Sequence, residues 1–351
     1  PTGTKWVFNI KQDEQGHIVE YHAHLVAQGF SQIPGMDFWD AYAPVAHIES
    51  IYAISGLAAT LDWEIHVVDV KSAFLNSEIP VDQPAYVAQP SGHVVKGKEN
   101  WVWLLHKALY GLCQSAFLWY QKLKEILITL GFKLCPSNPC VFFCCTKKGT
   151  VIITSHVDDL GLFASSKSNL SKHVVISDKE EISQLLGMTV TQDRAAHTIS
   201  FNQSLYIDSI VEHLTQPHTT LEEQSKMVKV PYQSAVGSIM HATVMTRPDI
   251  SHACQCVAQF MQNPGEAHWT AVKQIIWYLK GTRNLSLTLG GASKSFDVTA
   301  WSDSDFAGHP DHGCCKSQDL LYYMQLIAIL KTVGAGYWAL YYTGDQLWLQ
   351  L

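Results

Sequence analysis

Short apolar runs divide the first 70 residues into strands and one helix. Residues 5–10 and 18–27 are rich in aromatic and β-branched side chains and flank a polar segment, which predicts a β-hairpin. Residues 50–60 carry Ala and Leu in a pattern typical of a helix. The β-branched run over residues 63–70 follows at once and predicts a strand, so we expect Asp69 near a strand end.

Residues 115–130 have the spacing of an amphipathic helix, and Gly131 stands where a left-handed residue would end it. We expect the apolar side chains of this helix to pack into the core, because such stripes usually form buried faces. They are Trp119, Leu123, Ile126, Leu127 and Leu130.

Residues 151–164 contain two apolar runs around a pair of adjacent carboxylates, Asp158 and Asp159. With a further strand expected over residues 142–145, the runs predict a buried hairpin with acid at its tip. Adjacent carboxylates repel each other and lose hydration on burial, so a cation such as Mg²⁺ would neutralise them. Taken alone, the pair is equally consistent with an acidic turn in water.

The rest of the pattern is mainly helical. Helices are predicted over residues 205–214, 232–243, 250–261 and 266–280, and short strands over residues 183–191, 285–289 and 296–301. Pro248 and Asp249 favour the first turn of a helix, and residues 216–230 read as a linker. Together these elements predict an α+β fold of antiparallel strands with helices packed on one face.

Composition sets the broad class. The 351 residues are 47% hydrophobic, which is enough for two or three units with real cores. No apolar stretch reaches the length of a membrane span, the first residues do not resemble a signal peptide, and Pro1 in place of Met indicates a fragment. Nine cysteines without paired CxxC spacing argue against a zinc site or disulfides and favour a reducing compartment.

Charge does not point to a nucleic-acid enzyme. The chain has 24 Lys and Arg against 31 Asp and Glu, a net charge of −7. Only 16% of its residues are charged, whereas about 25% is usual. A nucleic-acid enzyme normally carries a basic stripe.

The acids nevertheless fit one reaction. A two-metal nucleotidyl transfer site needs carboxylates from separate strands, which hold two Mg²⁺ ions beside the attacking hydroxyl and the departing pyrophosphate. Asp69 at a strand end and the pair Asp158 and Asp159 at a hairpin tip meet this requirement if they converge.

Several motifs occur in a characteristic order. They are Lys5-Trp6-Val7-Phe8, Leu25-Val26-Ala27-Gln28-Gly29-Phe30, Tyr42-Ala43-Pro44-Val45, Asp69-Val70-Lys71-Ser72-Ala73-Phe74-Leu75-Asn76, Leu109-Tyr110-Gly111-Leu112, His156-Val157-Asp158-Asp159, Thr246-Arg247-Pro248-Asp249-Ile250 and Trp301-Ser302-Asp303-Ser304-Asp305. In this order they closely resemble the reverse transcriptase of copia-type long-terminal-repeat retrotransposon Pol polyproteins, from about residue 3 to about residue 308.

The resemblance implies a right-hand polymerase. Fingers and a palm with an antiparallel sheet are expected over residues 1–190, a helical thumb or connection over residues 191–282, and a truncated ribonuclease H-like part with a diverged tail over residues 283–351. It also implies an RNA or DNA template-primer and deoxynucleoside triphosphates as partners, and no membrane association. The location implied is intracellular, either cytoplasmic in a virus-like particle or nuclear.

Site residues carry over by position. The resemblance assigns Asp69 to the first metal-binding Asp, and Asp158 and Asp159 to the pair of the YVDD box, holding two Mg²⁺ ions with Mn²⁺ as an alternative. Phe74 matches the bulky gate that excludes the ribose 2′-hydroxyl, although a core aromatic is the simpler interpretation of the residue alone. Gln114 matches the glutamine that touches the incoming nucleotide.

Departures from the family pattern favour a degenerate copy. In the fingers, where the family reads YKARLVAKGF, His22, His24 and Gln28 replace cations that should bind the triphosphate, and His is mostly neutral at pH 7 at its ordinary pKa of about 6.5. Further replacements are Cys113 for Lys, Ala116 for Pro, Phe117 for Arg and His156 for Tyr.

Three functional interpretations follow. The first is an RNA-directed DNA polymerase acting through Asp69, Asp158 and Asp159, and the second is an inactive relic that at most binds nucleic acid. The third, a metal-dependent nuclease using Asp303 and Asp305, is disfavoured because the partner carboxylates of a ribonuclease H site are missing.

Overall fold

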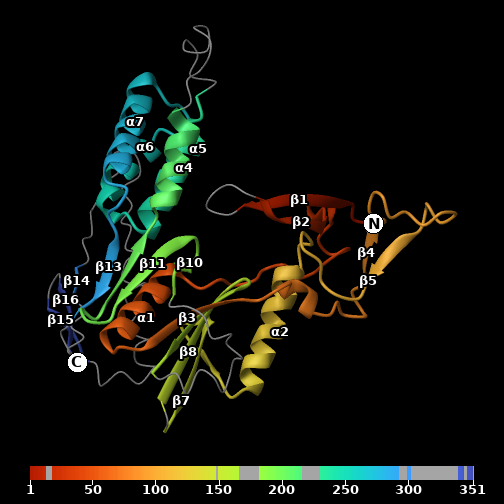
Figure 1. Cartoon of the computed structure of the whole chain (residues 1–351), viewed down its shortest axis with the longest axis horizontal. Helices are drawn as coiled ribbons and strands as arrows, with labels where there is room; N and C mark the ends of the chain where they lie inside the picture. The colour runs from red at the N-terminus through yellow and green to blue at the C-terminus, as the bar shows by residue number, and fades with distance from the viewer. Residues whose placement is uncertain are drawn as a thin grey trace. The chain divides into compact units, whose positions relative to one another are not determined.

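The computed structural model describes residues 1–12, 18–147, 149–165, 182–215, 230–291, 299–301, 339–343 and 346–350 (Figure 1). The chain forms two compact units, one of Pro1–Ala46 with Val68–Leu160 and the other of His47–Val67 with Gly161–Leu351. The described part contains six α-helices and several antiparallel strand pairs, as expected for an α+β protein. None of its helices has the length and apolar character needed to cross a membrane.

Two antiparallel ribbons belong to the first unit. The predicted N-terminal hairpin is confirmed as β1 (Thr4–Gln12) paired with β2 (Ile18–Ala27). A second ribbon, which the sequence pattern did not predict, joins β4 (Ala85–Ala88) to β5 (Val102–Leu105). The side of β4 carrying Val87 is fully buried in a small apolar cluster.

The five-stranded sheet has the order β3-β9-β8-β7-β6. Its strands are β3 (Glu64–Asp69), β6 (Lys133–Cys135), β7 (Asn138–Thr146), β8 (Gly149–His156) and β9 (Asp159–Ala164). Strands β6, β7 and β8 are antiparallel, and the apolar runs of β8 and β9 are buried almost throughout. The predicted hairpin with acid at its tip is therefore confirmed as a structural element.

Helix α2 (Ser115–Thr129) confirms the predicted amphipathic helix, and Gly131 adopts the expected left-handed conformation with φ of 89°. The prediction that all five of its apolar side chains lie in the core was wrong for two of them. Ile126 and Leu130 remain 40% and 43% exposed. The buried stripe of the helix is narrower than its apolar pattern.

In the second unit, α1 (Ile48–Thr60) lies against strands of a four-stranded sheet with the order β10-β11-β12-β13. The strands are β10 (Gln184–Leu185), β11 (Met188–Asp193), β12 (Thr198–Asn202) and β13 (Leu287–Gly290). A single strand over residues 183–191 was predicted, which is wrong because Leu186 and Gly187 both take positive φ and turn the chain back into a hairpin.

A helical bundle forms the other part of the second unit. It comprises α4 (Ser204–Thr215), α5 (Tyr232–Met245), the 3₁₀ helix η5 (Pro248–Ile250), α6 (Ser251–Ala258) and α7 (Glu266–Gly281). These helices share one apolar core, which includes Ile207, Val236, Ile239, Val257, Val272 and Ile276. The predicted helices of this region are confirmed.

A three-stranded sheet of β14 (Thr299–Trp301), β15 (Ala339–Thr343) and β16 (Gln346–Gln350) contains the last described residues. Asp303, Asp305 and residues 216–229 of the linker expected over residues 216–230 lie outside the described residues. The subdivision into fingers with palm, thumb and ribonuclease H-like part stays a prediction.

Candidate active site at the acidic hairpin

The tip of the acidic hairpin is a two-residue turn in the first unit. Strand β8 ends at His156 and β9 begins at Asp159, so Val157 and Asp158 form the turn. Val157 has a φ of 60°, a left-handed conformation that costs a residue with a Cβ roughly 1–2 kcal/mol. Other contacts must therefore hold the turn in this shape.

Three carbonyl groups at the tip accept hydrogen bonds from three separate segments. Ser155 O accepts from the backbone N–H of Ala46 at 3.2 Å, and Asp158 O accepts from the backbone N–H of Val70 at 3.1 Å. Val157 O accepts from the indole Nε1–H of Trp119 at 2.7 Å. At about 1 kcal/mol each, these bonds together exceed the strain at Val157.

The bond from Val70 matters most for the predicted site. Asp69 is the last residue of β3, so this bond brings the end of β3 beside the hairpin tip at the level of the backbone. The side chain of Asp69 is not among the described side chains. Within the described side chains, no group of three or more His, Cys, Asp or Glu forms a metal cluster.

The carboxylates at the tip fit a hard divalent cation. Asp158 and Asp159 are both half-buried, which weakens their hydration without removing access from solvent. Carboxylate oxygens are the ligands that Mg²⁺ prefers, and Mg²⁺ usually keeps open positions for phosphate oxygens. A third carboxylate at residue 69 would complete such a set.

The residues predicted to select the nucleotide lie on other elements of the same unit. Phe74 lies on the 3₁₀ helix η2 (Ala73–Asn76) and is half-buried, with its ring 4.3 Å from the ring of Tyr110. Gln114 precedes α2 and is 7% exposed. Its Oε1 accepts a hydrogen bond of 3.1 Å from Nε2 of Gln32.

His22 and His24 lie on β2 on either side of Ala23, with stacked rings whose centroids are 5.7 Å apart. Side chains two positions apart on a strand share a face, so both imidazoles belong to one side of the ribbon. That they replace triphosphate-binding cations stays a prediction.

The sequence pattern missed Trp119 as a residue that supports the site. Its periodic position predicted a core residue, and it is indeed only 4% exposed. Burial of an indole usually requires an acceptor for its N–H, which here is the carbonyl of the turn. That need was the available signal, but the sequence could not identify the acceptor.

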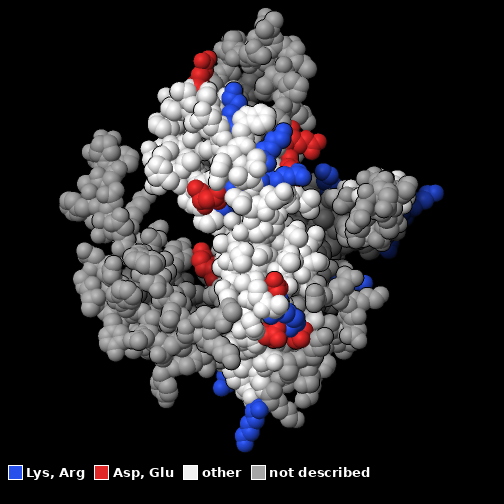
Figure 2. All heavy atoms as spheres, turned by 60° about the vertical axis from the view of Figure 1, so that its left-hand side comes forward, with Lys and Arg blue, Asp and Glu red and all other residues white. Residues whose placement is uncertain are grey.

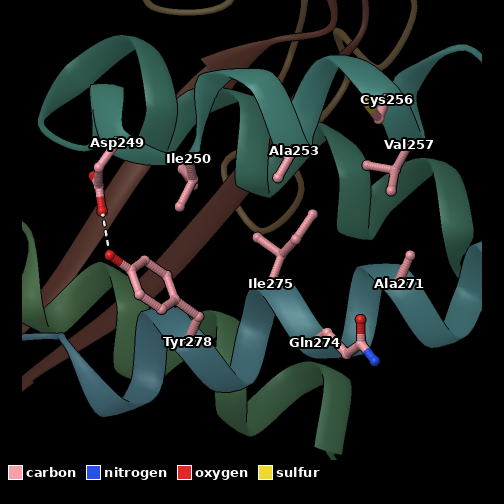
Figure 3. Close-up of a pocket in the computed structure, with 9 residues that line it drawn as sticks. All are labelled: Asp249, Ile250, Ala253, Cys256, Val257, Ala271, Gln274, Ile275 and Tyr278. Carbon is pink, nitrogen blue, oxygen red and sulfur yellow. Dashed lines mark hydrogen bonds between the residues drawn. The ribbon is translucent and has the colours of Figure 1, made fainter.

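A separate pocket of about 410 Å³ lies in the second unit, with η5 and α6 on one side and α7 on the other (Figure 3). Apolar side chains such as Ile250, Val257 and Ile275 line it, and at one end the hydroxyl of Tyr278 donates to Asp249 at 3.0 Å. None of the described residues predicted to act in catalysis lines this pocket.

The same end of the bundle contains a buried cation. Arg247 is 1% exposed and donates two hydrogen bonds to the carboxylate of Asp249 and two to Thr282. The hydrogen bonds from Arg247 lower the pKa of Asp249, although its partial burial opposes this shift. The predicted helix start at this motif is confirmed, but the arginine also ties it to the end of α7.

Charged side chains are sparse among the described residues on the face drawn in Figure 2. The Lys and Arg residues visible there stand singly or in small groups, interspersed with Asp and Glu, rather than as a continuous stripe. This agrees with the low charged fraction of 16%.

Comparison with known proteins identifies the class. The family model described as "Reverse transcriptase (RNA-dependent DNA polymerase)" matches residues 1–223, which include the strand ending at Asp69 and the whole acidic hairpin. The chain belongs to the reverse transcriptase family.

Curated relatives narrow this to retrotransposon polyproteins. The chain is 35% identical over its whole length to the retrovirus-related Pol polyprotein from transposon TNT 1-94 of Nicotiana tabacum, covering 29% of that protein. Over 88% of the chain it is 32% and 30% identical to those from transposons RE1 and RE2 of Arabidopsis thaliana, covering 22% of each. The resemblance to copia-type Pol polyproteins is thus confirmed, and the chain spans less than a third of their length.

Proposed function

We propose that the chain is the RNA-directed DNA polymerase of a copia-type retrotransposon, with Asp69, Asp158 and Asp159 as its catalytic carboxylates. One observation carries this proposal: the N–H of Val70, directly after Asp69, donates to the carbonyl of Asp158. This bond brings together the backbones beside two acids that are 89 positions apart along the chain, which supports the convergence that two-metal nucleotidyl transfer requires.

The three carboxylates would hold two Mg²⁺ ions, or Mn²⁺ in their place. When bound, these ions supply charge neutralisation for the triphosphate and favour ionisation of the attacking primer hydroxyl. The chain itself contributes a fixed frame. Trp119, Ala46 and Val70 hold the turn carbonyls, so the carboxylates need little reorganisation when substrate binds.

Selection of the nucleotide is assigned to the neighbouring elements. Phe74 would exclude the ribose 2′-hydroxyl by steric contact, and Gln114 would contact the incoming nucleotide. His22 and His24 would face the triphosphate from β2. Because an imidazole binds phosphate less tightly than a guanidinium or ammonium group, we expect a high KM for deoxynucleoside triphosphates.

The substrates proposed are an RNA or DNA template with its primer and deoxynucleoside triphosphates. Residues 1–190 would form fingers and palm, residues 191–282 thumb or connection, and residues 283–351 a ribonuclease H remnant beginning near Asp303. A retrotransposon polymerase of this type would act inside the cell, in a cytoplasmic virus-like particle or in the nucleus.

The lost cations favour a second candidate, an inactive relic that at most binds nucleic acid. Primer extension distinguishes the two. We expect the chain to extend an oligo(dT) primer on poly(rA) with Mg²⁺ or Mn²⁺, and the variant Asp158→Asn to show no extension. Equal extension by the two proteins would reject the carboxylate assignment. Absence of extension by both, with template-primer still bound, would support the relic.

A further inference from the structure

The ring of Phe74 does not stand alone. Its centroid lies 4.3 Å from that of Tyr110, with the two planes tilted by 48°. Both side chains are half-buried, and both belong to the first unit. A contact this close leaves no room for the Phe74 ring to move toward Tyr110.

The backbone at Tyr110 and Gly111 passes very close to the backbone of residues 27–29. Tyr110 O accepts from the N–H of Ala27 at 2.7 Å, and Gly111 O accepts from the N–H of Gly29 at 2.9 Å. Gly111 has a φ of 91°, and a Cβ built there would lie 2.1 Å from Ala27 O. The backbone that carries Tyr110 therefore has little freedom to move away from Phe74.

Gln114, by contrast, is already engaged within the protein. It is 7% exposed, and its Oε1 accepts from Gln32, whose own Oε1 accepts from the N–H of Cys113 at 2.8 Å. This network orients the amide of Gln114 toward Gln32. Tyr110, in contrast, packs its ring directly against the ring of Phe74.

We propose that Tyr110 is a positioning residue for sugar discrimination and acts by holding the ring of Phe74 in place. This inference rests on the proposed polymerase function and adds a specificity residue to it. A steric gate rejects a 2′-hydroxyl only to the extent that its ring resists displacement. Tyr110 supplies that resistance through ring packing, so its aromatic ring matters and its hydroxyl does not.

The test measures binding without chemistry. The chain is bound to a template-primer whose primer ends in a dideoxynucleotide and whose next template base is U. The concentrations of dATP and of ATP that stabilise this complex against competitor DNA give the preference for deoxyribose. The variants are Tyr110→Ala, Tyr110→Leu, Tyr110→Phe and Phe74→Ala, with Tyr86→Ala as a control at an exposed tyrosine of the same unit.

We expect Tyr110→Ala and Tyr110→Leu to lower the preference for dATP about three- to tenfold, the range of one aromatic pair contact. Tyr110→Phe and Tyr86→Ala should keep it. Phe74→Ala should abolish the preference, and adding Tyr110→Ala should then change nothing further. Tyr110→Leu fills much of the same volume, so it tests the ring if the alanine variant fails to fold.

An unchanged preference in folded Tyr110→Leu would overturn the inference, as would an equal loss from Tyr110→Ala in the Phe74→Ala background. So would an original chain that binds dATP and ATP equally well. Binding with the expected pattern but no primer extension would reject catalysis while supporting the role of Tyr110. Failure to bind either nucleotide would reject both.

Discussion

The acidic hairpin and the end of the bundle around Arg247 are both held in place by hydrogen bonds between remote segments, but through different groups. At the hairpin, backbone carbonyls of three residues are bound by three separate segments, and the carboxylates themselves remain half-buried and accessible. In the bundle, one buried guanidinium makes four hydrogen bonds to Asp249 and Thr282. The proposed site is thus held through its backbone, whereas the junction at Arg247 depends on a single side chain.

The largest predicted effect tests the dependence on Arg247. Arg247→Met leaves the carboxylate of Asp249 without its buried partner, and breaking such a pair costs about 3–5 kcal/mol. We expect this variant to lose about 3 kcal/mol of unfolding free energy, the lower end of this range, because Asp249 is itself 36% exposed. Urea denaturation measures the change.

A matched control exists in the same unit. Arg283 also binds an aspartate, donating to both oxygens of Asp208 at 2.8 Å, but the two side chains are 50% and 44% exposed. Arg283→Met should cost less than about 1 kcal/mol. Equal losses from the two substitutions would show that burial does not separate the two pairs.

A smaller loss of stability is expected at the hairpin, because three hydrogen bonds hold the tip and each substitution removes only one of them. Trp119→Phe removes the donor to Val157 O and should cost about 1 kcal/mol of stability. Since small displacements of reacting groups slow catalysis strongly, primer extension should fall about tenfold or more.

The neighbouring residue on α2 gives the control. Tyr120 is also buried, and its hydroxyl donates to Pro139 O at 3.0 Å, at the start of β7 rather than at the tip. Tyr120→Phe should lower stability by a similar amount but leave primer extension unchanged. If both variants lost activity alike, the bond to Val157 would have no special role.

The smallest predicted effect concerns acid. The hydrogen bonds from Arg247 lower the pKa of Asp249, so the ionised carboxylate stabilises the fold above its unfolded pKa of about 3.9. This contribution is lost as the pH falls below about 4 through the lowered pKa, and solvent screening keeps it under about 1 kcal/mol. The urea midpoints at pH 6 and pH 3 should differ less for Asp249→Asn than for the unchanged chain. An equal difference between the two midpoints in both proteins would show that Arg247 does not stabilise the fold through the ionised Asp249.

Elements with a clear period were predictable from the sequence. The hairpin of β1 and β2, α2 and the helices of the bundle follow from alternation or helical spacing. The ribbon of β4 and β5 was missed because Val102–Leu105 is apolar at every position, and such short runs do not distinguish strand from helix. The turn at Leu186 was missed because a branched apolar residue rarely adopts positive φ.

The site could be predicted only in part. The candidate acids could be named because adjacent carboxylates between apolar runs are chemically unusual, and the motif order supplied the family. Contacts between remote residues left no mark in the sequence pattern: Trp119 reads as core, and Tyr110 reads as one letter of a motif. Arg247 likewise reads as a helix start, although its burial ties two helices together.

If the proposed polymerase site is right, the end of β3 and the hairpin tip bind divalent cations together. Fe²⁺ with ascorbate and peroxide, used in place of Mg²⁺, cleaves the backbone wherever the ion is bound and requires no polymerase activity. We expect cuts near both Asp69 and Asp158, suppressed by excess Mg²⁺ and absent in Asp158→Asn. Cuts at only one of these segments, or cuts that survive the substitution, would contradict it.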